Sequence, residues 1–487
     1  MIVLVLVAFL AAAGLLAWIT GGRVARAIAA VALGLALAFG AVVLAIAAPD
    51  SAWRSFDEPW IPSLGIRLQF GVDGLSGILI LLALVVGLLA VLVSWSEIRH
   101  RRGFFDFNLL VSLAGVVGVF GALDLVLFYV FWELMLVPMV LLIAVWGHED
   151  RLRAALKFFV FTHAGSLFLL AAILALGAFY RAETGAWSFQ LADLAGAAPT
   201  GYPGLVIMLG FFIGFAVKIP AVPFHTWLPD AHTQAPTAGS VVLAGLLLKA
   251  GAYGLIRFAL PLFPEASIAL APIAMTLGVV GILYGAVLAF SQPDFKRLVA
   301  YTSISHMGFA LLGIYAMTEL ALIGAVLLLV AHAFSTGGLF VVAGALEARL
   351  ETRQLRRMGG LWASAPRLGA AALILVMASL GLPGLANFAA EFSIFFGAFG
   401  PAPWFVAAAA IGLILSALYG LRLLQGVFFG PPRWEGIADL SPREAAVLGV
   451  ATVVLVVLGL YPIPVIDAAS GAITAALDPL MSRGASP

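Results

Sequence analysis

The chain has 487 residues, of which 63% are hydrophobic and 10% charged, and its net charge is +1. Soluble domains carry about 25% charged residues, so this composition indicates a polytopic membrane protein. The absence of cysteine excludes disulfides, thiolate metal ligands, iron–sulfur ligation and cysteine nucleophiles. The near-zero net charge and the lack of a basic arm exclude an obvious nucleic-acid-binding role.

Apolar segments predict fourteen membrane-spanning helices, because about 20 apolar residues are needed to cross a bilayer. The first segment lacks the basic region of a signal peptide and is expected to be retained as a span. No soluble domain fits between spans, and residues 49–72 and 181–202 are predicted to be short loops. The predicted spans are 2–20, 24–48, 73–95, 107–121, 123–146, 154–180, 203–225, 238–258, 266–290, 296–315, 321–345, 367–396, 402–430 and 445–466.

The basic residues predict how these spans are oriented. Most lysines and arginines lie in loops after odd-numbered spans, and Arg26 is counted among them. Loops after even-numbered spans hold few basic residues, including Arg257. Since the number of spans is even, both termini are expected to lie outside the cytoplasm.

Two opposite charges lie inside the predicted first half of the bundle. Glu133 is in the middle of the fifth span, and Lys218 lies in the seventh, directly before Pro220 and Pro223. A charge at mid-membrane costs about 2.5–3.5 kcal/mol on insertion scales, and a proline-broken helix needs protein or water around its free carbonyls. A neutral glutamate and a snorkelling lysine are the structural alternatives. The pattern favours a proton-exchanging carboxylate paired with a lysine.

Four further polar residues lie inside later spans. Lys249 is in the eighth span, and Glu391 lies in the twelfth, a helix that Pro383 is predicted to break. Both are interpreted as proton-exchanging groups on the same argument. His306 and His332 are also inside spans, where a neutral imidazole suits proton relay and a packing histidine is the competing interpretation.

The end of the seventh span holds three more polar groups. His225, Asp230 and His232 follow the predicted helix break, and they either take up protons or cap the helix. The sequence leaves both alternatives open.

The remaining histidines carry weaker signals. His163 is balanced between a relay role and a packing role, and His100 and His148 are loop residues with no predicted function. No pair of histidines has a convincing ligand spacing on one helix face, so no metal site is predicted.

The middle of the chain contains an internal repeat. Glu133 precedes Lys218 by 85 residues, and His306 precedes Glu391 by the same interval. Each copy has five spans, the fourth of them broken, and copies with an odd number of spans insert with opposite topology. The chain therefore divides into residues 1–106, a first five-helix unit at 107–258, an inverted second unit at 266–430, and a C-terminal helix and tail at 431–487. How the residues of the two copies correspond is left open.

Several segments of the chain resemble those of a known family. LVLFYVFWELMLVPM, FAVKIPAVPFHTWLPDAHTQAPTAGS, DFKRLVAYTSISHMGF and SLGLPGLANFAAEF resemble the M-type antiporter-like subunits of bacterial NADH:quinone oxidoreductase, respiratory complex I. The match runs from about residue 70 over nearly all of the remaining chain.

The resemblance implies an all-α membrane protein that moves protons while redox chemistry happens in other subunits. It implies no cofactor in this chain, with FMN, iron–sulfur clusters and quinone held by partner subunits. The implied partners are L-type and N-type neighbours, small membrane subunits and lipids in the bacterial cytoplasmic (inner) membrane, with both termini periplasmic. The implied roles are an ion pair of Glu133 and Lys218, a central relay at Lys249, terminal exchange at Glu391, and His306 and His332 along the connecting path.

The chain also departs from the family pattern. Gln234 stands where an acid is usual, Ala331-His332-Ala333 replaces asparagine–histidine–glycine, and His163 is unusual at its position. Two alternatives keep the fold and change the function. One is a subunit of a sodium/proton antiporter or a membrane-bound hydrogenase, and the other is a scaffold whose buried charges only hold a complex together.

Overall fold

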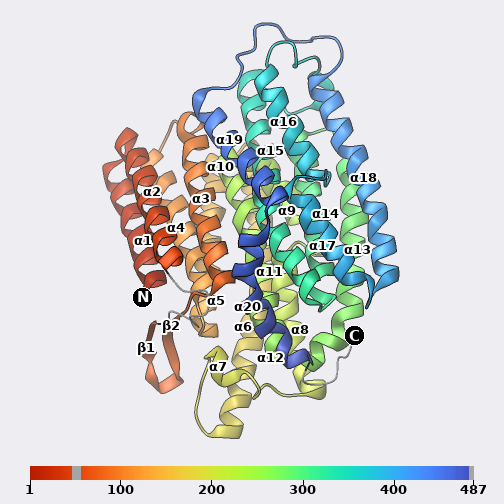
Figure 1. Ribbon diagram of the computed structural model, residues 1–487. Coiled ribbons are helices and arrows are strands. Elements are labelled where there is room, and N and C mark those ends of the chain that lie inside the picture. Colours follow the sequence, from red (N-terminus) through yellow and green to blue (C-terminus); the bar gives the residue numbers. More distant parts are fainter. Residues whose placement is uncertain (47–55, 482–487) are drawn as a thin grey trace.

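Long, roughly aligned helices dominate the computed structural model, which describes residues 1–46 and 56–481 (Figure 1). Fourteen of the described helices are long and apolar enough to cross a membrane. The predicted all-α polytopic fold is therefore confirmed. The few strands form one two-stranded sheet in the described part of the chain.

The N-terminal segment contains three long helices and one hairpin. Part of the predicted loop at 49–72 is an antiparallel β-hairpin in which Phe56 pairs with Phe70, so the loop prediction was wrong there. Residues 49–55 of that loop lie outside the described residues. The elements are α1 (Ile2–Thr20), α2 (Gly22–Ile46), β1 (Phe56–Ile61), η1 (Pro62–Leu64), β2 (Ile66–Phe70) and α3 (Gly74–Glu97).

The first five-helix unit contains a helix break where it was predicted. Its seventh span ends at Lys218, and a short helix resumes at Trp227 after the prolines. The eighth span is irregular, because two π-helical turns interrupt it. The elements are α4 (Arg102–Gly121), α5 (Leu125–Trp146), α6 (Arg151–Thr184), α7 (Leu191–Leu194), α8 (Gly201–Lys218), α9 (Trp227–Gln234), α10 (Thr237–Val242), η2 (Leu243–Leu247), α11 (Leu248–Gly254), η3 (Leu255–Ala259) and α12 (Leu260–Leu262).

The second unit repeats this order, and its fourth helix is also broken. The predicted span 367–396 is two short helices that meet at Gly381–Leu385. The final predicted span stops earlier than expected, at Leu460, and a separate helix follows it. The elements are α13 (Pro264–Ser291), α14 (Phe295–Tyr315), α15 (Glu319–Leu350), η4 (Leu355–Arg357), α16 (Pro366–Ser379), α17 (Ala386–Phe399), α18 (Pro403–Phe428), α19 (Pro442–Leu460) and α20 (Ile463–Met481).

Corresponding backbone bridges mark the two units as structural copies. Asp124 is the N-cap of α5 and forms an isolated bridge with Gln190, and Asp294 is the N-cap of α14 and forms one with Gln354. Each aspartate accepts backbone N–H groups of the helix that it caps, as N-cap residues do. Since α5 and α14 are five spans apart, these bridges lie at opposite ends of the bundle.

The helices of the second unit approach one another closely. A Cβ atom on Gly308 of α14 would lie 2.5 Å from the carbonyl oxygen of Gly278 on α13. Only glycine leaves room for backbones at this separation, and small residues serve this purpose at helix contacts in membranes.

Two arginines that the sequence analysis assigned to loops lie inside the bundle. Arg26 is buried in α2, where its Nη1 atom lies 3.3 Å from a carboxylate oxygen of Asp106 on α4 and contacts Ser94. Arg257 is buried in η3 and forms a 2.6 Å ion pair with Asp73, the N-cap of α3. Arg26 and Asp106 join α2 to α4, and Arg257 and Asp73 join η3 to the start of α3. Each arginine has a carboxylate partner, which explains why its charge is tolerated inside the bundle.

We expect Arg26→Met to lower the stability of the protein strongly, by about 3–5 kcal/mol, because it leaves the Asp106 carboxylate buried without a counter-charge. The double variant Arg26→Met/Asp106→Leu should recover most of that loss. Thermal denaturation of the detergent-solubilised protein measures both effects. Equal destabilisation of the single and double variants would contradict this account.

Candidate functional site

Glu133 lies on α5 and contacts a residue that the sequence left undecided. Its Oε2 atom is 3.1 Å from Nδ1 of His163 on α6. The other carboxylate oxygen, Oε1, is buried and has no hydrogen-bond partner in the described part of the protein. His163 therefore belongs to the site, although its sequence signal alone did not place it there.

Lys218 lies at the end of α8, deep inside the unit. Its side chain is 1% exposed, and its ammonium group faces the ring of Trp132, 5.1 Å from the ring centroid. Such a cation–π contact stabilises a desolvated ammonium group. The Nζ atom has no hydrogen-bond partner among the described residues.

The proposed Glu133–Lys218 pair is not in direct contact in this structure. Lys218 is within electrostatic reach of the Glu133 carboxylate, but the contact that Glu133 makes is with His163. Trp132, the neighbour of Glu133 on α5, provides the surface against which the lysine packs.

The helix break after Lys218 leaves backbone carbonyls that need donors. The Nε1–H group of Trp227, the first residue of α9, donates to the Val217 carbonyl at 3.0 Å. The N–H group of Ala221 donates to the carbonyl of Ala216 at 2.9 Å. The interrupted segment is therefore tied back onto α8, as a break inside a membrane requires.

Lys249 lies at the centre of the bundle and joins the two units. Its fully buried amino group is 2.6 Å from Nδ1 of His332 on α15, and it also donates to the Ala244 carbonyl in η2. Which of the two nitrogens donates in the Lys249–His332 contact depends on the tautomer of the imidazole and the charge of the lysine.

His306 continues this line towards Glu391. The rings of His332 and His306 meet edge to face with centroids 5.4 Å apart. Nε2 of His306 donates to the Ser379 carbonyl at 3.0 Å and lies 3.9 Å from a carboxylate oxygen of Glu391. Ser379 is the last residue of α16, so His306 satisfies a carbonyl at the second helix break.

The backbone at that break also confines Glu391. Gly381 has φ +71°, a left-handed conformation, and a Cβ atom there would lie 2.8 Å from Oε2 of Glu391. Glycine is needed at this position for both reasons. The predicted residues Lys249, His332, His306 and Glu391 thus form one continuous series of contacts.

The three residues predicted at the end of the seventh span, His225, Asp230 and His232, have different surroundings. Asp230 pairs with Lys157 at 2.6 Å and with Arg297 at 2.9 Å. It lines an open cavity of about 340 Å³, together with Asp150, Arg153, Ala154, Thr233, Gln234 and Arg297.

The two histidines of this group are buried. His232 stacks on Phe340 with ring centroids 4.4 Å apart, and His225 meets Tyr284 edge to face. Neither ring nitrogen of His232 has a hydrogen-bond partner among the described residues, so it does not cap a helix. Asp230 alone of the three is at the open cavity.

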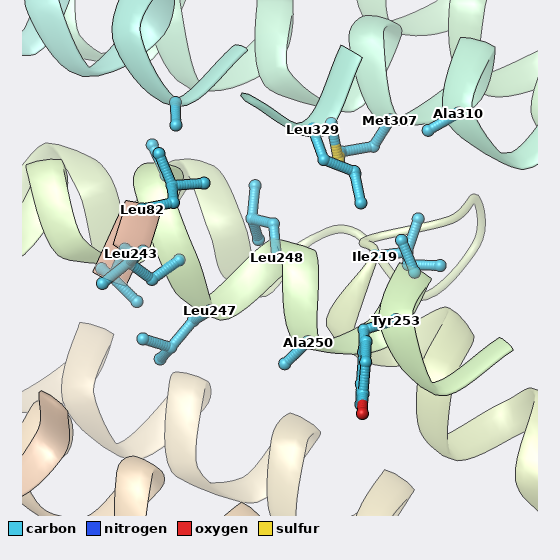
Figure 2. Close-up of a cluster of buried hydrophobic side chains, with 14 of the residues drawn as sticks. Leu82, Ile219, Leu243, Leu247, Leu248, Ala250, Tyr253, Met307, Ala310 and Leu329 are labelled. Carbon is cyan, nitrogen blue, oxygen red and sulfur yellow. The ribbon is translucent and has the colours of Figure 1, made fainter. Parts of the chain in front are cut away.

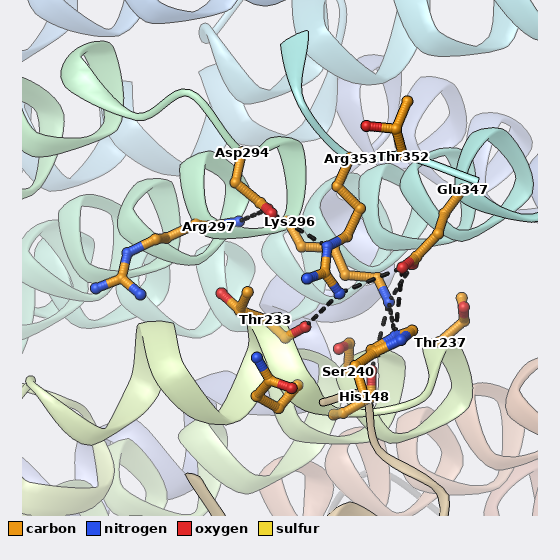
Figure 3. A network of polar contacts seen from close by, with 12 residues as sticks. His148, Thr233, Thr237, Ser240, Asp294, Lys296, Arg297, Glu347, Thr352 and Arg353 are labelled. Carbon is orange, nitrogen blue, oxygen red and sulfur yellow. Dashed lines mark hydrogen bonds and ion pairs between the residues drawn. The ribbon is translucent and has the colours of Figure 1, made fainter. Parts of the chain in front are cut away.

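A second polar cluster, which the sequence analysis missed, connects the ends of α14 and α15 with the loop after α5 (Figure 3). Lys296 is fully buried, pairs with Glu347 at 2.9 Å and lies 3.2 Å from Nε2 of His148. Arg353 contacts both Glu347 and Asp294. The available signal was the position of Lys296 at the start of a predicted span, but it was counted only as a loop charge.

The comparisons with known proteins agree on one family. Residues 122–418 match the family described as NADH:quinone oxidoreductase/Mrp antiporter, transmembrane. The chain is 47% identical to NADH-quinone oxidoreductase subunit M of Escherichia coli K12, over 96% of each chain.

Solved structures extend the likeness to the fold. A chain of respiratory complex I from Thermus thermophilus with bound NADH is 34% identical, with a TM-score of 0.90 and coverage of 99% of this chain and 100% of that one. A chain of the Mrp complex from Dietzia sp. is 22% identical with a TM-score of 0.85 and 98% coverage of both chains, which shows a shared fold.

His148, the loop histidine of the second polar cluster, is expected to make the stability of the protein depend on pH. Burial and then the charge of Lys296 lower the pKa of His148 from 6.5 to about 4. Because the folded state prefers the neutral imidazole, its contribution to stability is complete above pH 6.5 and is lost as pH falls towards 4. We expect the melting temperature to fall by a few degrees between pH 7 and pH 5, and His148→Gln to reduce that fall. An unchanged pH dependence in His148→Gln would contradict the assignment.

Proposed function

The chain belongs to the family of NADH:quinone oxidoreductase and Mrp antiporter membrane subunits, and we propose that it is the M-type, proton-translocating subunit of an NADH:quinone oxidoreductase. The likeness to subunit M of E. coli covers 96% of the chain at 47% identity. The likeness to the Mrp chain is 22%, which supports the fold only. The complex I assignment is therefore favoured over the antiporter.

The observation that carries this function is the unbroken series Lys249–His332–His306–Glu391. Its members come from α11, α15, α14 and α17. Nζ of Lys249 lies 2.6 Å from the His332 ring, the rings of His332 and His306 have centroids 5.4 Å apart, and His306 lies 3.9 Å from the Glu391 carboxylate. Lysine, imidazole and carboxylate can each release and accept a proton, and they lie where hydrocarbon would otherwise exclude charge. The series crosses from the first unit into the second.

The coupling step is assigned to Glu133 and Lys218. An opposite charge nearby favours a protonated lysine, and the effect is large in a low-dielectric interior. When the carboxylate moves away from the lysine, the ammonium N–H bond breaks more readily, and the proton is transferred to the Lys249 amine. These groups titrate together, so their proton affinities belong to the set.

Leu248 and Ala250, which flank Lys249 in the sequence, lie in a cluster of buried hydrophobic side chains (Figure 2). Ile219 follows Lys218, Leu248 precedes Lys249, and both belong to the buried core with Met307 and Leu329. A proton does not cross apolar packing without a polar carrier, so transfer from Lys218 to Lys249 needs water or a polar group between the two lysines.

Beyond Lys249 the interior becomes polar. Several buried polar atoms along the series have no hydrogen-bond partner within the described residues, and buried polar groups are normally satisfied by protein or ordered water. These atoms belong to Ser335, Thr336, Ser379, Asn387 and Tyr419.

The remaining assignments follow from family and composition. We place the chain in the bacterial cytoplasmic membrane with both termini periplasmic, supported by the excess of basic residues in loops after odd-numbered spans. Its partners are the other membrane subunits, including L-type and N-type neighbours, and lipids. FMN, iron–sulfur clusters and quinone are assigned to partner subunits, consistent with a chain that has no cysteine.

We expect Glu133→Ala and Lys218→Ala to reduce NADH-driven proton pumping in membrane vesicles by roughly tenfold, while the complex still assembles. The reason is that either change removes one member of the coupling pair. A scaffold role predicts loss of assembly in Lys218→Ala instead, because breaking a buried charge interaction is strongly destabilising. Normal pumping with normal assembly would refute the proposed function.

The host complex can be identified separately. Purification of this chain in mild detergent should yield flavin- and iron–sulfur-containing subunits that oxidise NADH. An Mrp-type antiporter would purify without redox subunits, and a membrane-bound hydrogenase would purify without NADH-oxidising activity. Either result would replace the assignment to complex I.

A further inference from the structure

A titratable pair lies at the outer surface of the bundle, within two membrane-spanning helices. The side chain of His163 on α6 is 38% exposed and that of Glu133 on α5 is 22% exposed. The surrounding surface of α6 is apolar, and Val160, Leu167 and Phe168 are exposed there. A polar pair in such a setting is costly unless it has a function.

The His163 ring is held in one orientation. It stacks on Phe159, one turn earlier on α6, with centroids 5.2 Å apart and planes 8° apart. The Ser166 hydroxyl donates to the His163 carbonyl at 2.9 Å. The ring therefore presents Nδ1 to the carboxylate of Glu133, 3.1 Å away.

The two oxygens of Glu133 have different surroundings. Oε2 contacts His163 at the outside, whereas Oε1 is buried and without a partner. Lys218 is within electrostatic reach of the carboxylate, and Tyr129, one turn earlier on α5, is a further titratable residue that interacts with Glu133. One carboxylate thus lies between two bases that can each carry a proton.

We propose that His163 is a second proton partner of Glu133, which exchanges a proton with Lys218 through the Glu133 carboxylate. This inference rests on the proposed function. Glu133, His163 and Lys218 share one transferable proton, and two charged arrangements of the trio result. In one, Lys218 is an ammonium ion and His163 is neutral; in the other, His163 is an imidazolium ion and Lys218 is neutral.

The transfer between these arrangements is balanced. The Nδ1–H bond of the imidazolium breaks as an O–H bond forms on Oε2 of Glu133, which gives a neutral imidazole and a neutral carboxylic acid. After the carboxyl group turns and moves closer to Lys218, the acid transfers its proton to the lysine amine, which regenerates the carboxylate and forms an ammonium ion. The net charge of the trio is zero throughout, which a low-dielectric environment favours.

The experiment compares substitutions of His163 in the complete, assembled complex. His163→Gln keeps a hydrogen-bond donor towards Glu133 but cannot carry a proton, and His163→Lys can carry one. Proton pumping and NADH oxidation are measured in membrane vesicles, with His100→Gln, a change in a loop histidine, as the matched control. We expect roughly tenfold slower pumping in His163→Gln, partial recovery in His163→Lys and no change in His100→Gln.

The outcomes separate this inference from the function on which it rests. Wild-type pumping in His163→Gln overturns the inference, and so does a defect confined to His163→Phe, which would show a packing role. If Glu133→Gln abolishes pumping while His163→Gln does not, the inference fails and the proposed function stands. If Glu133→Gln also pumps normally, the proposed function fails. The double variant His163→Gln/Glu133→Gln should pump no more slowly than Glu133→Gln alone, because both changes interrupt the same proton transfer.

Discussion

A helix that breaks inside a membrane leaves carbonyl groups without donors, and much of this structure follows from that constraint. At the first break, Trp227 and Ala221 supply the donors and return the chain to α8 directly below Lys218. At the second break, the donor to the Ser379 carbonyl is His306, which belongs to the proposed proton path. The functional groups are therefore held in place by the same bonds that make the breaks possible.

The contact between Lys249 and His332 has a comparable importance for the whole bundle, because it joins the two five-helix units through their interiors. The π-helical turn before Lys249 presents the Ala244 carbonyl to the ammonium group, and α15 contributes the imidazole. Neither unit alone contains all members of the proposed path. Under this proposal the inverted repeat supplies two halves of one route rather than two independent routes.

Much of the fold, and the buried position of the candidate site residues, could be predicted because charge and proline inside an apolar segment are physically costly. This cost identified Glu133, Lys218, Lys249 and Glu391 from single positions. Contacts between distant spans carry no such signal: nothing local indicates that His163 meets Glu133, or that His148 meets Lys296. Arg26 and Arg257 were placed in loops because their partners, Asp106 and Asp73, are near neighbours only in three dimensions.

The close approach of Gly381 to Glu391 has a mechanical consequence. The carboxylate lies against bare backbone at the joint between α16 and α17, with no side chain to absorb a displacement. A small shift of one half-helix relative to the other must therefore change the distance between Glu391 and His306. The geometry of this joint therefore sets how strongly the His306 ring and the Glu391 carboxylate interact.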